Sequence, residues 1–239
     1  MRTEGPGWLR PLIHDKRDGP LPALLLGLTV LTGLVDAVSI LSLGRVFVAN
    51  MTGNVVFIGF ALAGAPGFSL AASVSALGGF LAGAGLGGRL AFRFGHDRGR
   101  LLFVATSVEL VCVGVGLLIV GLEANPLPGV ARDGAAAVVA VALGAQNAAV
   151  RALAIPDLTT TVLTMTLTGL AADVRAGLGP AVIRRFLAVV TMFGGAAIGA
   201  LLDLKVSPAA ALGAAVAVLF AVTVATVAST RRGQLLDRA

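Results

Sequence analysis

The chain has 239 residues, of which 57% are apolar and 13% are charged. Because soluble domains carry about 25% charged residues, this chain lacks the charge that would cover a water-facing surface, which excludes a soluble protein. The formal net charge of +6 does not predict nucleic-acid binding, since the Arg residues lie in short segments between apolar runs and form no continuous patch. We therefore expect the lipid bilayer, and not nucleic acid, to be the partner of this surface.

Residues that hold metals and cofactors are scarce. Cys112 is the single cysteine, and His14 and His96 are the two histidines, so the sequence offers no His/Cys cluster for zinc or haem. It also has no Walker loop, no G-x-S-x-G elbow and no dinucleotide fingerprint. We expect no cofactor and no metal.

The first predicted element is a membrane span. Residues 1–20 carry four basic residues and precede an apolar run of 23 residues from Leu21 to Leu43. That run is too long for the core of a signal peptide, and no small-residue cleavage site follows it, so we predict a retained helix. Asp18 can cap this helix, and Pro20 suits its first turn.

Seven further apolar stretches follow along the chain. They cover about residues 46–64, 68–90, 101–122, 134–155, 158–172, 186–202 and 209–229. This pattern predicts an all-α polytopic transmembrane helical bundle. We expect a single integral membrane domain over residues 21–229, between a cytoplasmic N-terminal segment (1–20) and a cytoplasmic C-terminal tail (230–239).

Two of the eight stretches are polar in the middle, where a lipid-facing helix is driest. Their polar side chains are Asn50, Thr52 and Asn54 in the second stretch, and Thr159, Thr160, Thr161, Thr164, Thr166 and Thr168 in the sixth. If all eight stretches cross the bilayer, 11 of the 18 basic residues lie on the side of the N-terminus, but if these two enter and return, 15 do. Because the cytoplasmic side is normally rich in Lys and Arg, we predict six crossings with both termini cytoplasmic in a bacterial inner membrane, with eight crossings as the alternative.

The chain also shows a weak internal repeat. Aligning Gly33 with Gly144 places Asp36 opposite Asn147, and a further shift of three residues places the Asn-rich stretch on the Thr-rich one. The two halves cover about residues 21–122 and 134–229. With three crossings each they would be inverted relative to one another, which is a transporter architecture, while chance matching of apolar sequence is the alternative.

Asp36 is the acidic residue of the first predicted span. The polar residues on its helical face are Thr29, Thr32 and Ser39. Inserting this acid costs about 3 kcal/mol, which the apolar residues of the same helix offset. Two roles stay open: a structural contact, paired with Arg45 or Arg151 or hydrogen-bonded to Thr, or a site for substrate or proton.

Uncharged amides form the second group of candidates. Asn50 and Asn54 lie one turn apart and suit either a polar solute or an interhelical hydrogen bond. In the second half, Gln146 and Asn147 precede Arg151, whose cation can also extend to the headgroups.

Glu109 lies near mid-depth of the stretch 101–122, where burial disfavours a charged carboxyl group. Asp36 and Glu109 are therefore the candidates for a proton-linked step. By contrast, Gly79, Gly83 and Gly87 repeat every four residues and predict close helix packing.

Four short strings carry a resemblance to a known family. They are V-D-A-V-S at residues 35–39, F-V-A-N-M-T-G-N at 47–54, Q-N-A at 146–148 and T-T-V-L-T at 160–164. In these strings the chain resembles the YoaK family of bacterial membrane proteins, also called domain of unknown function 1275, over about residues 21–228. Met165 stands where the family commonly has Gly. The resemblance implies an integral inner-membrane protein without an established substrate or reaction.

We expect a small transporter or channel-like carrier of a small polar solute, with a proton-linked step as one version. The expected solute contacts are Asp36, Asn50, Thr52, Asn54, Gln146, Asn147, Thr164 and Thr168, and the expected proton or counter-ion residues are Asp36, Glu109, Arg45 and Arg151. A non-transporting structural or regulatory membrane subunit is the alternative. The sequence does not determine whether the chain forms a homo-oligomer. We do not expect an enzyme, because Asp157 lies near a predicted surface and no second acid accompanies Asp36 in a recognised motif.

Overall fold

The computed structural model describes residues 18–123, 127–156, 158–161, 163–173, 180–233 and 235. Within these residues the chain forms eight α-helices and no β-strand, which confirms the predicted all-α class. The helices are α2 (Leu21–Leu41), α3 (Met51–Leu62), α4 (Leu70–Phe94), α5 (Arg98–Leu122), α6 (Gly129–Leu153), α7 (Leu163–Asp173), α8 (Pro180–Lys205) and α9 (Pro208–Arg231).

Six of these helices are long enough to cross a bilayer. They have between 21 and 26 residues and are apolar over most of their length. The other two, α3 and α7, have 12 and 11 residues, which at 1.5 Å per residue gives about 18 and 17 Å. Because the hydrocarbon core is about 30 Å thick, neither short helix is long enough to span it. The described chain has six candidate spans, which agrees with the prediction of six crossings.

Side-chain caps fix where several helices begin. The Asn50 side chain accepts a hydrogen bond from the Thr52 N–H, so α3 begins at Met51 and the first residues of the predicted stretch are not helical. Asp18 does not cap α2 as expected. Instead Pro20 occupies the N-cap position of α2, and the Asp18 carboxylate pairs with Arg98.

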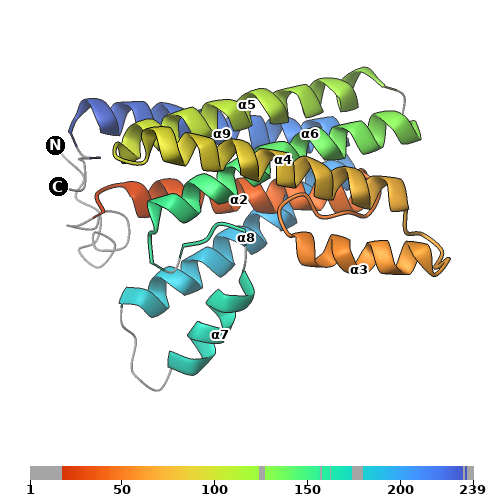
Figure 1. Cartoon of the computed structure of the whole chain (residues 1–239), viewed down its shortest axis with the longest axis horizontal. Helices are drawn as coiled ribbons and strands as arrows, with labels where there is room; N and C mark the ends of the chain where they lie inside the picture. The colour runs from red at the N-terminus through yellow and green to blue at the C-terminus, as the bar shows by residue number, and fades with distance from the viewer. Residues whose placement is uncertain are drawn as a thin grey trace.

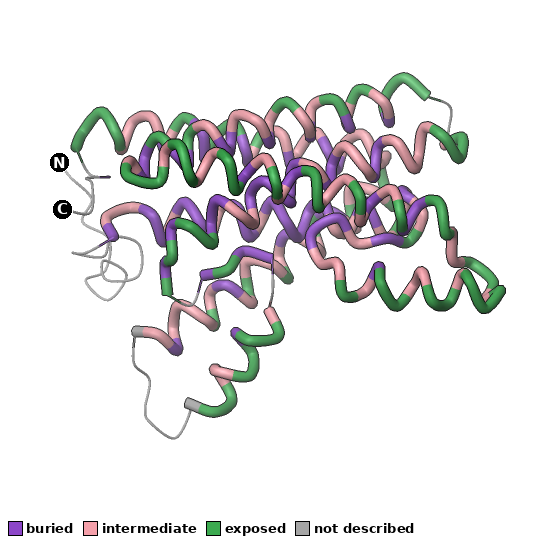
Figure 2. Tube along the Cα trace, in the orientation of Figure 1, coloured by how far each residue is buried: buried purple, intermediate pink, exposed green. Residues whose placement is uncertain are grey.

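The two halves of the chain interlock in the bundle. Helix α2 packs on α8 and α9, while α6 packs on α4 and α5, and α5 also contacts α9. Figure 1 shows α2 and α6 running in opposite directions, with α3 beside α4 and α7 beside α8. Among the six long helices, α2 and α6 have the largest buried share, as Figure 2 shows for α2. These two helices form the centre of the molecule.

Glycines bring the helix pairs α2–α8 and α4–α6 into backbone contact. A Cβ atom at Gly33 in α2 would collide with the carbonyl oxygen of Met192 in α8, and a Cβ atom at Gly144 in α6 would collide with that of Phe80 in α4. The same holds for Gly79, Gly83 and Gly87 against α6, and for Gly195 and Gly199 against α2. The predicted glycine stripe is thus a close-packed interface.

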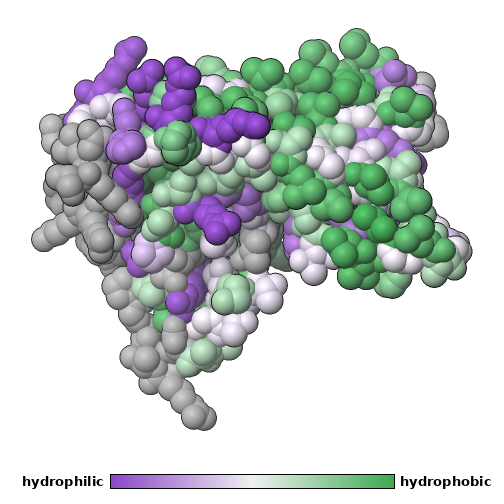
Figure 3. All heavy atoms as spheres, in the orientation of Figure 1, coloured by the Kyte–Doolittle hydropathy of each residue, from purple (hydrophilic) through white to green (hydrophobic). Residues whose placement is uncertain are grey.

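The two ends of the bundle differ in charge. Helix α2 begins and α9 ends at the same end (Figure 1), where the Asp18 carboxylate lies 2.9 Å from the buried Arg98 guanidinium. The described basic residues of this arginine-rich end are Arg89, Arg93, Arg98, Arg100, Arg151, Arg184, Arg185, Arg231 and Arg232, and those of the opposite end are Arg45, Arg132 and Lys205. Figure 3 shows hydrophilic side chains gathered toward one end and hydrophobic ones over much of the remaining face.

Candidate functional site

Asp36 contacts the segment that joins α2 to α3. This segment, residues 42–50, returns toward the bundle after α2 ends (Figure 1). The half-buried Asp36 carboxyl group accepts hydrogen bonds from the backbone N–H groups of Val48 and Ala49, and its Oδ1 atom is buried without a further partner. Within the described residues Asp36 forms no ion pair with Arg45 or Arg151. The carboxyl group therefore holds the returning segment through its main chain.

Asn54 holds the same segment from the other side. Its side chain is fully buried, with Oδ1 accepting from the Phe47 N–H at 2.9 Å and Nδ2 donating to the Phe47 carbonyl oxygen. Both polar atoms of the amide are thus used within the chain. Asn54 is the single buried residue of α3, so the remaining side chains of this helix lie at least partly on the surface.

The other polar residues near α3 have local roles. Asn50 is the N-cap of α3, and Thr52 is exposed. Gly53 has to lack a side chain, because a Cβ atom there would meet the ring of Phe47, which stacks on Phe57 with ring centroids 6.0 Å apart. Asn50, Thr52 and Asn54 therefore have three different surroundings: a helix cap, an exposed surface and a buried contact with Phe47.

The second half has a corresponding contact between a central helix and the segment after it. The Asn147 Oδ1 atom in α6 accepts a hydrogen bond from the Thr161 hydroxyl at 2.9 Å. Beside it, Gln146 Nε2 donates to Thr160 at 2.9 Å and to Thr32 of α2 at 3.3 Å, while Gln146 Oε1 is buried without a partner. Gln146 thus links the two central helices directly.

A cavity of about 560 Å³ opens beside Asn147. It lies between α4 and α6 and is lined by Phe80, Ala84, Gly88, Asn147, Ala148, Arg151 and Ala152. Arg151 is exposed, and within the described residues it makes no ion pair. The structure thus brings two of the predicted site residues, Asn147 and Arg151, together at this cavity.

Comparison with known proteins places the chain in a family. Residues 24–225 match the family described as "Protein of unknown function (DUF1275)". The chain belongs to the DUF1275 family. It is also 32% identical over 151 residues to the UPF0700 transmembrane protein YoaK of Bacillus subtilis (strain 168), an alignment that covers 63% of this chain and 66%, slightly less than two thirds, of that relative. No solved structure matches. The protein is thus a multi-pass membrane protein of an uncharacterised family, as its sequence motifs predict.

The Thr-rich stretch of this DUF1275 protein is divided between two roles. Thr164 and Thr168 of α7 are exposed, and the Thr168 hydroxyl donates to the Thr164 carbonyl oxygen at 2.9 Å. Thr160 and Thr161, which are buried, are the residues that contact Gln146 and Asn147. Sequence reasoning missed these two partners because six threonines in ten residues carry no signal of which ones face the bundle.

Glu109 is fully buried in α5, which packs chiefly on α6 and α9. Neither of its carboxyl oxygens has a hydrogen-bond partner within the described residues. Asp36 lies on a different helix, α2, which packs chiefly on α8 and α9. Asp157, the acid considered for catalysis, lies outside the described residues.

Proposed function

We propose that this DUF1275 protein is a carrier of a small polar solute, built from two inverted repeats in a bacterial inner membrane. One observation carries the proposal: the antiparallel central helices α2 and α6 each place a polar side chain against the segment that follows them. Asp36 contacts Val48 and Ala49, and Asn147 contacts Thr161. Each of these segments leads to a helix too short to cross the bilayer. Discontinuous helices at the interface of inverted repeats are where secondary transporters bind solute and ion.

Helix packing supports the repeat residue by residue. Gly33 of α2 lies against Met192 and Ala196 of α8. Gly144 of α6 lies in the same way against Phe80 and Ala84 of α4, and each of these residues is 111 or 112 positions from its counterpart. The glycines of α4 and α8 are related by the same shift. Gly83 meets Val141 as Gly195 meets Val30, and Gly87 meets Ala145 as Gly199 meets Leu34. This correspondence of contacts supports a repeat over chance similarity of apolar sequence.

The arrangement narrows the expected solute contacts to four residues. Asp36, Gln146 and Asn147 lie on the two central helices, and Arg151 shares the cavity of Asn147. The unpaired Oδ1 of Asp36 and Oε1 of Gln146 offer two buried acceptors to a donor group of the solute. Asn54 is already bound to Phe47, and Thr52, Thr164 and Thr168 face outward, which leaves them outside this set.

We place the arginine-rich end in the cytoplasm. The positive-inside rule favours this orientation, because the opposite end of the described chain carries Arg45, Arg132 and Lys205 alone. Both ends of the described chain then face the cytoplasm. In this orientation the segment 42–50 faces the outer side of the membrane.

Vesicle uptake tests the carrier proposal. We would reconstitute the full chain in liposomes containing a pH-sensitive dye and measure uptake of amino acids, sugars and small carboxylates at several pH values. Asp36→Asn is expected to slow uptake about tenfold or more, because a buried charge-assisted contact is worth about 1.5–3 kcal/mol, and to remove its pH dependence. Glu123→Gln, the same change at an exposed acid after α5, is the control and should leave uptake unchanged.

Two outcomes would count against this assignment. Uptake unchanged in rate and in pH dependence would remove Asp36 from the mechanism. If no solute of the panel enters faster than it enters protein-free vesicles, the structural or regulatory subunit replaces the carrier. Asn54 favours that second candidate, because both its polar atoms are occupied within the chain.

A further inference from the structure

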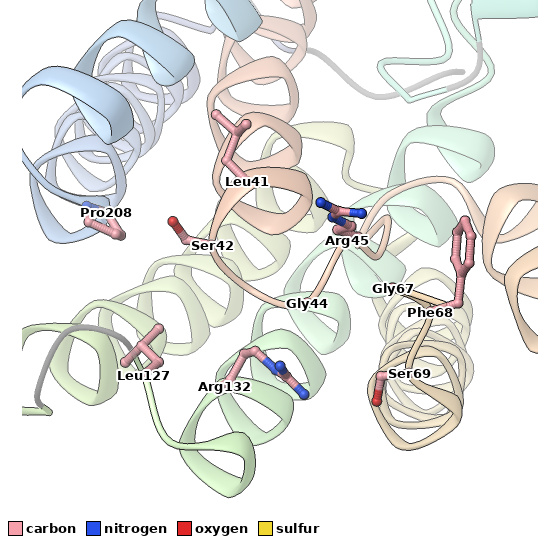
Figure 4. A pocket seen from close by; sticks show the side chains of 10 residues that line it. All are labelled: Leu41, Ser42, Gly44, Arg45, Gly67, Phe68, Ser69, Leu127, Arg132 and Pro208. Carbon is pink, nitrogen blue, oxygen red and sulfur yellow. The ribbon is translucent and has the colours of Figure 1, made fainter. Parts of the chain in front are cut away.

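A second cavity, of about 570 Å³, lies at the end of the bundle opposite the arginine-rich end. Four parts of the chain converge on it: the end of α2 with the segment after it, the turn before α4, the start of α6 and the start of α9. Figure 4 shows its lining residues, which are Leu41, Ser42, Gly44, Arg45, Gly67, Phe68, Ser69, Leu127, Arg132 and Pro208. We call it the outer cavity.

The outer cavity brings together two basic residues of its end. The described chain places three basic residues at this end, and two of them, Arg45 and Arg132, line the cavity. They come from different elements and lie on either side of Gly44 in Figure 4. The positive-inside rule explains the arginines at the other end of the bundle. It does not explain two arginines that line one cavity at this end.

Two glycines let these side chains lie against the main chain. Gly44 has a φ of +95°, and a Cβ atom there would lie 3.1 Å from Arg132 Nε. Gly67 has a φ of +84°, and a Cβ atom there would lie 3.0 Å from an Arg45 terminal nitrogen. Arg45 itself has a φ of +58°, a conformation that residues other than glycine rarely adopt. Both side chains therefore lie against main chain that has no side chain of its own.

The guanidinium groups keep free donors. Arg132 donates from Nε to Asp133 at 3.0 Å, which leaves its terminal nitrogens without a partner in the described chain. Arg45 makes no hydrogen bond or ion pair there. The nearby acid Asp203 accepts from the Ser42 hydroxyl at 2.9 and 3.0 Å and is not among the lining residues. The cavity thus presents unused cationic donors and no free carboxylate in its lining.

We propose that the outer cavity binds an oxyanion, a phosphate, sulfate or carboxylate group, between Arg45 and Arg132. A guanidinium group binds such an oxyanion through two parallel charge-assisted hydrogen bonds, and a second guanidinium adds further donors and charge. The cavity is larger than one such group, so it accepts the anionic end of a larger molecule. That molecule is a soluble anion or a phospholipid headgroup, since both carry the same chemistry. The site does not depend on the carrier proposal.

Binding of sulfate in defined lipid tests the site. The full chain is placed in nanodiscs of phosphatidylcholine and titrated with sodium sulfate against sodium chloride of equal ionic strength, with calorimetry as the measurement. A parallel arm measures phosphatidylglycerol that stays bound to the detergent-purified chain by native mass spectrometry. The variants are Arg45→Gln and Arg132→Gln, with Arg93→Gln, an exposed arginine of the other end, as control.

Each variant is expected to weaken binding at least tenfold, and the control less than twofold. If sulfate binds and its binding depends on both arginines, the ligand of the outer cavity is a soluble anion. If only phosphatidylglycerol is retained, and its retention depends on the arginines, the ligand is a phospholipid headgroup. Arg45→Gly removes the guanidinium at a backbone position that suits glycine, so loss of binding in this variant is not a folding defect. Absence of both signals in the native chain, or equal loss in the Arg93 control, overturns the proposal.

Discussion

The side-chain amide of Asn54 fixes the path of the segment between α2 and α3. The segment after α2 is not helical, so its buried backbone groups need partners outside the segment. Asn54 supplies an acceptor and a donor to Phe47, and Asp36 supplies an acceptor to the next two residues. Two side chains from different helices thus replace the hydrogen bonds that a continuous helix would have made.

Removing the Asn54 amide is therefore expected to destabilise the fold. Asn54→Ala leaves the N–H and carbonyl groups of Phe47 unpaired, which costs about 1–3 kcal/mol for each buried group. Thr52→Ala, on the exposed side of the same turn, is the control and should change stability by less than about 0.5 kcal/mol. Unfolding in detergent by heat or denaturant measures both variants. Equal stability of Asn54→Ala and the native chain would show that water satisfies Phe47 instead.

The candidate site shows what residue types can and cannot predict. Polar residues inside apolar stretches were predicted to matter, and Asp36, Gln146 and Asn147 do contact the segments after the central helices. Which polar residues face inward could not be predicted, because the segment before each short helix is irregular and has no fixed period. Thr160 and Thr161 of this irregular segment are buried, whereas Thr164 and Thr168 of α7 are exposed.

At the scale of helices, the lengths of the apolar runs and the spacing of the glycines predict which helices are long and where helices pack closely. Six long apolar runs gave six long helices, and the two polar stretches gave two short ones. The predicted ends of a helix differ from the observed ends where charged residues lie inside the helix. The stretch 186–202 was expected to be helical, but α8 extends over Pro180–Lys205 and includes Arg184 and Arg185. Arginine does not end a helix, because its intrinsic helix propensity is high.

Matched glycine substitutions test the packing of the two helix pairs. Gly83→Ala in α4 and Gly195→Ala in α8 each place a methyl group into the backbone of the partner helix. Gly78→Ala and Gly194→Ala, in the same two helices, meet nothing within 4 Å and should gain up to about 1 kcal/mol of helix stability. We expect the first two variants to lower the unfolding temperature in detergent by a similar amount, at about 1–3 kcal/mol for an overpacked contact. A large loss in α4 with none in α8 would contradict the equivalence of the two interfaces.

For the whole molecule, the distribution of charge and the helix lengths agree on one topology. The count of Lys and Arg favours six crossings, and α3 and α7 are too short to span the hydrocarbon core as single helices. The ion pair between Asp18 and Arg98 also ties the start of α2 to the start of α5, so these two helix ends lie on one side. The count could be made from sequence alone, whereas the pairing of Asp18 with Arg98 could not, because they are 80 residues apart.

Cysteine labelling tests this topology directly. Starting from Cys112→Ala, single cysteines at the exposed positions 63, 93, 130 and 232 are treated with a membrane-impermeant maleimide in intact cells and in inverted vesicles. Six crossings place positions 93 and 232 on one side, and 63 and 130 on the other. Eight crossings would separate 93 from 232 and group 232 with 63 and 130. Labelling of 93 and 232 in inverted vesicles but not in cells is the expected result, because the proposed orientation places the arginine-rich end in the cytoplasm. The reverse pattern would keep the fold but place the outer cavity and its two arginines on the cytoplasmic side, where the oxyanions that reach them would be those of the cell interior.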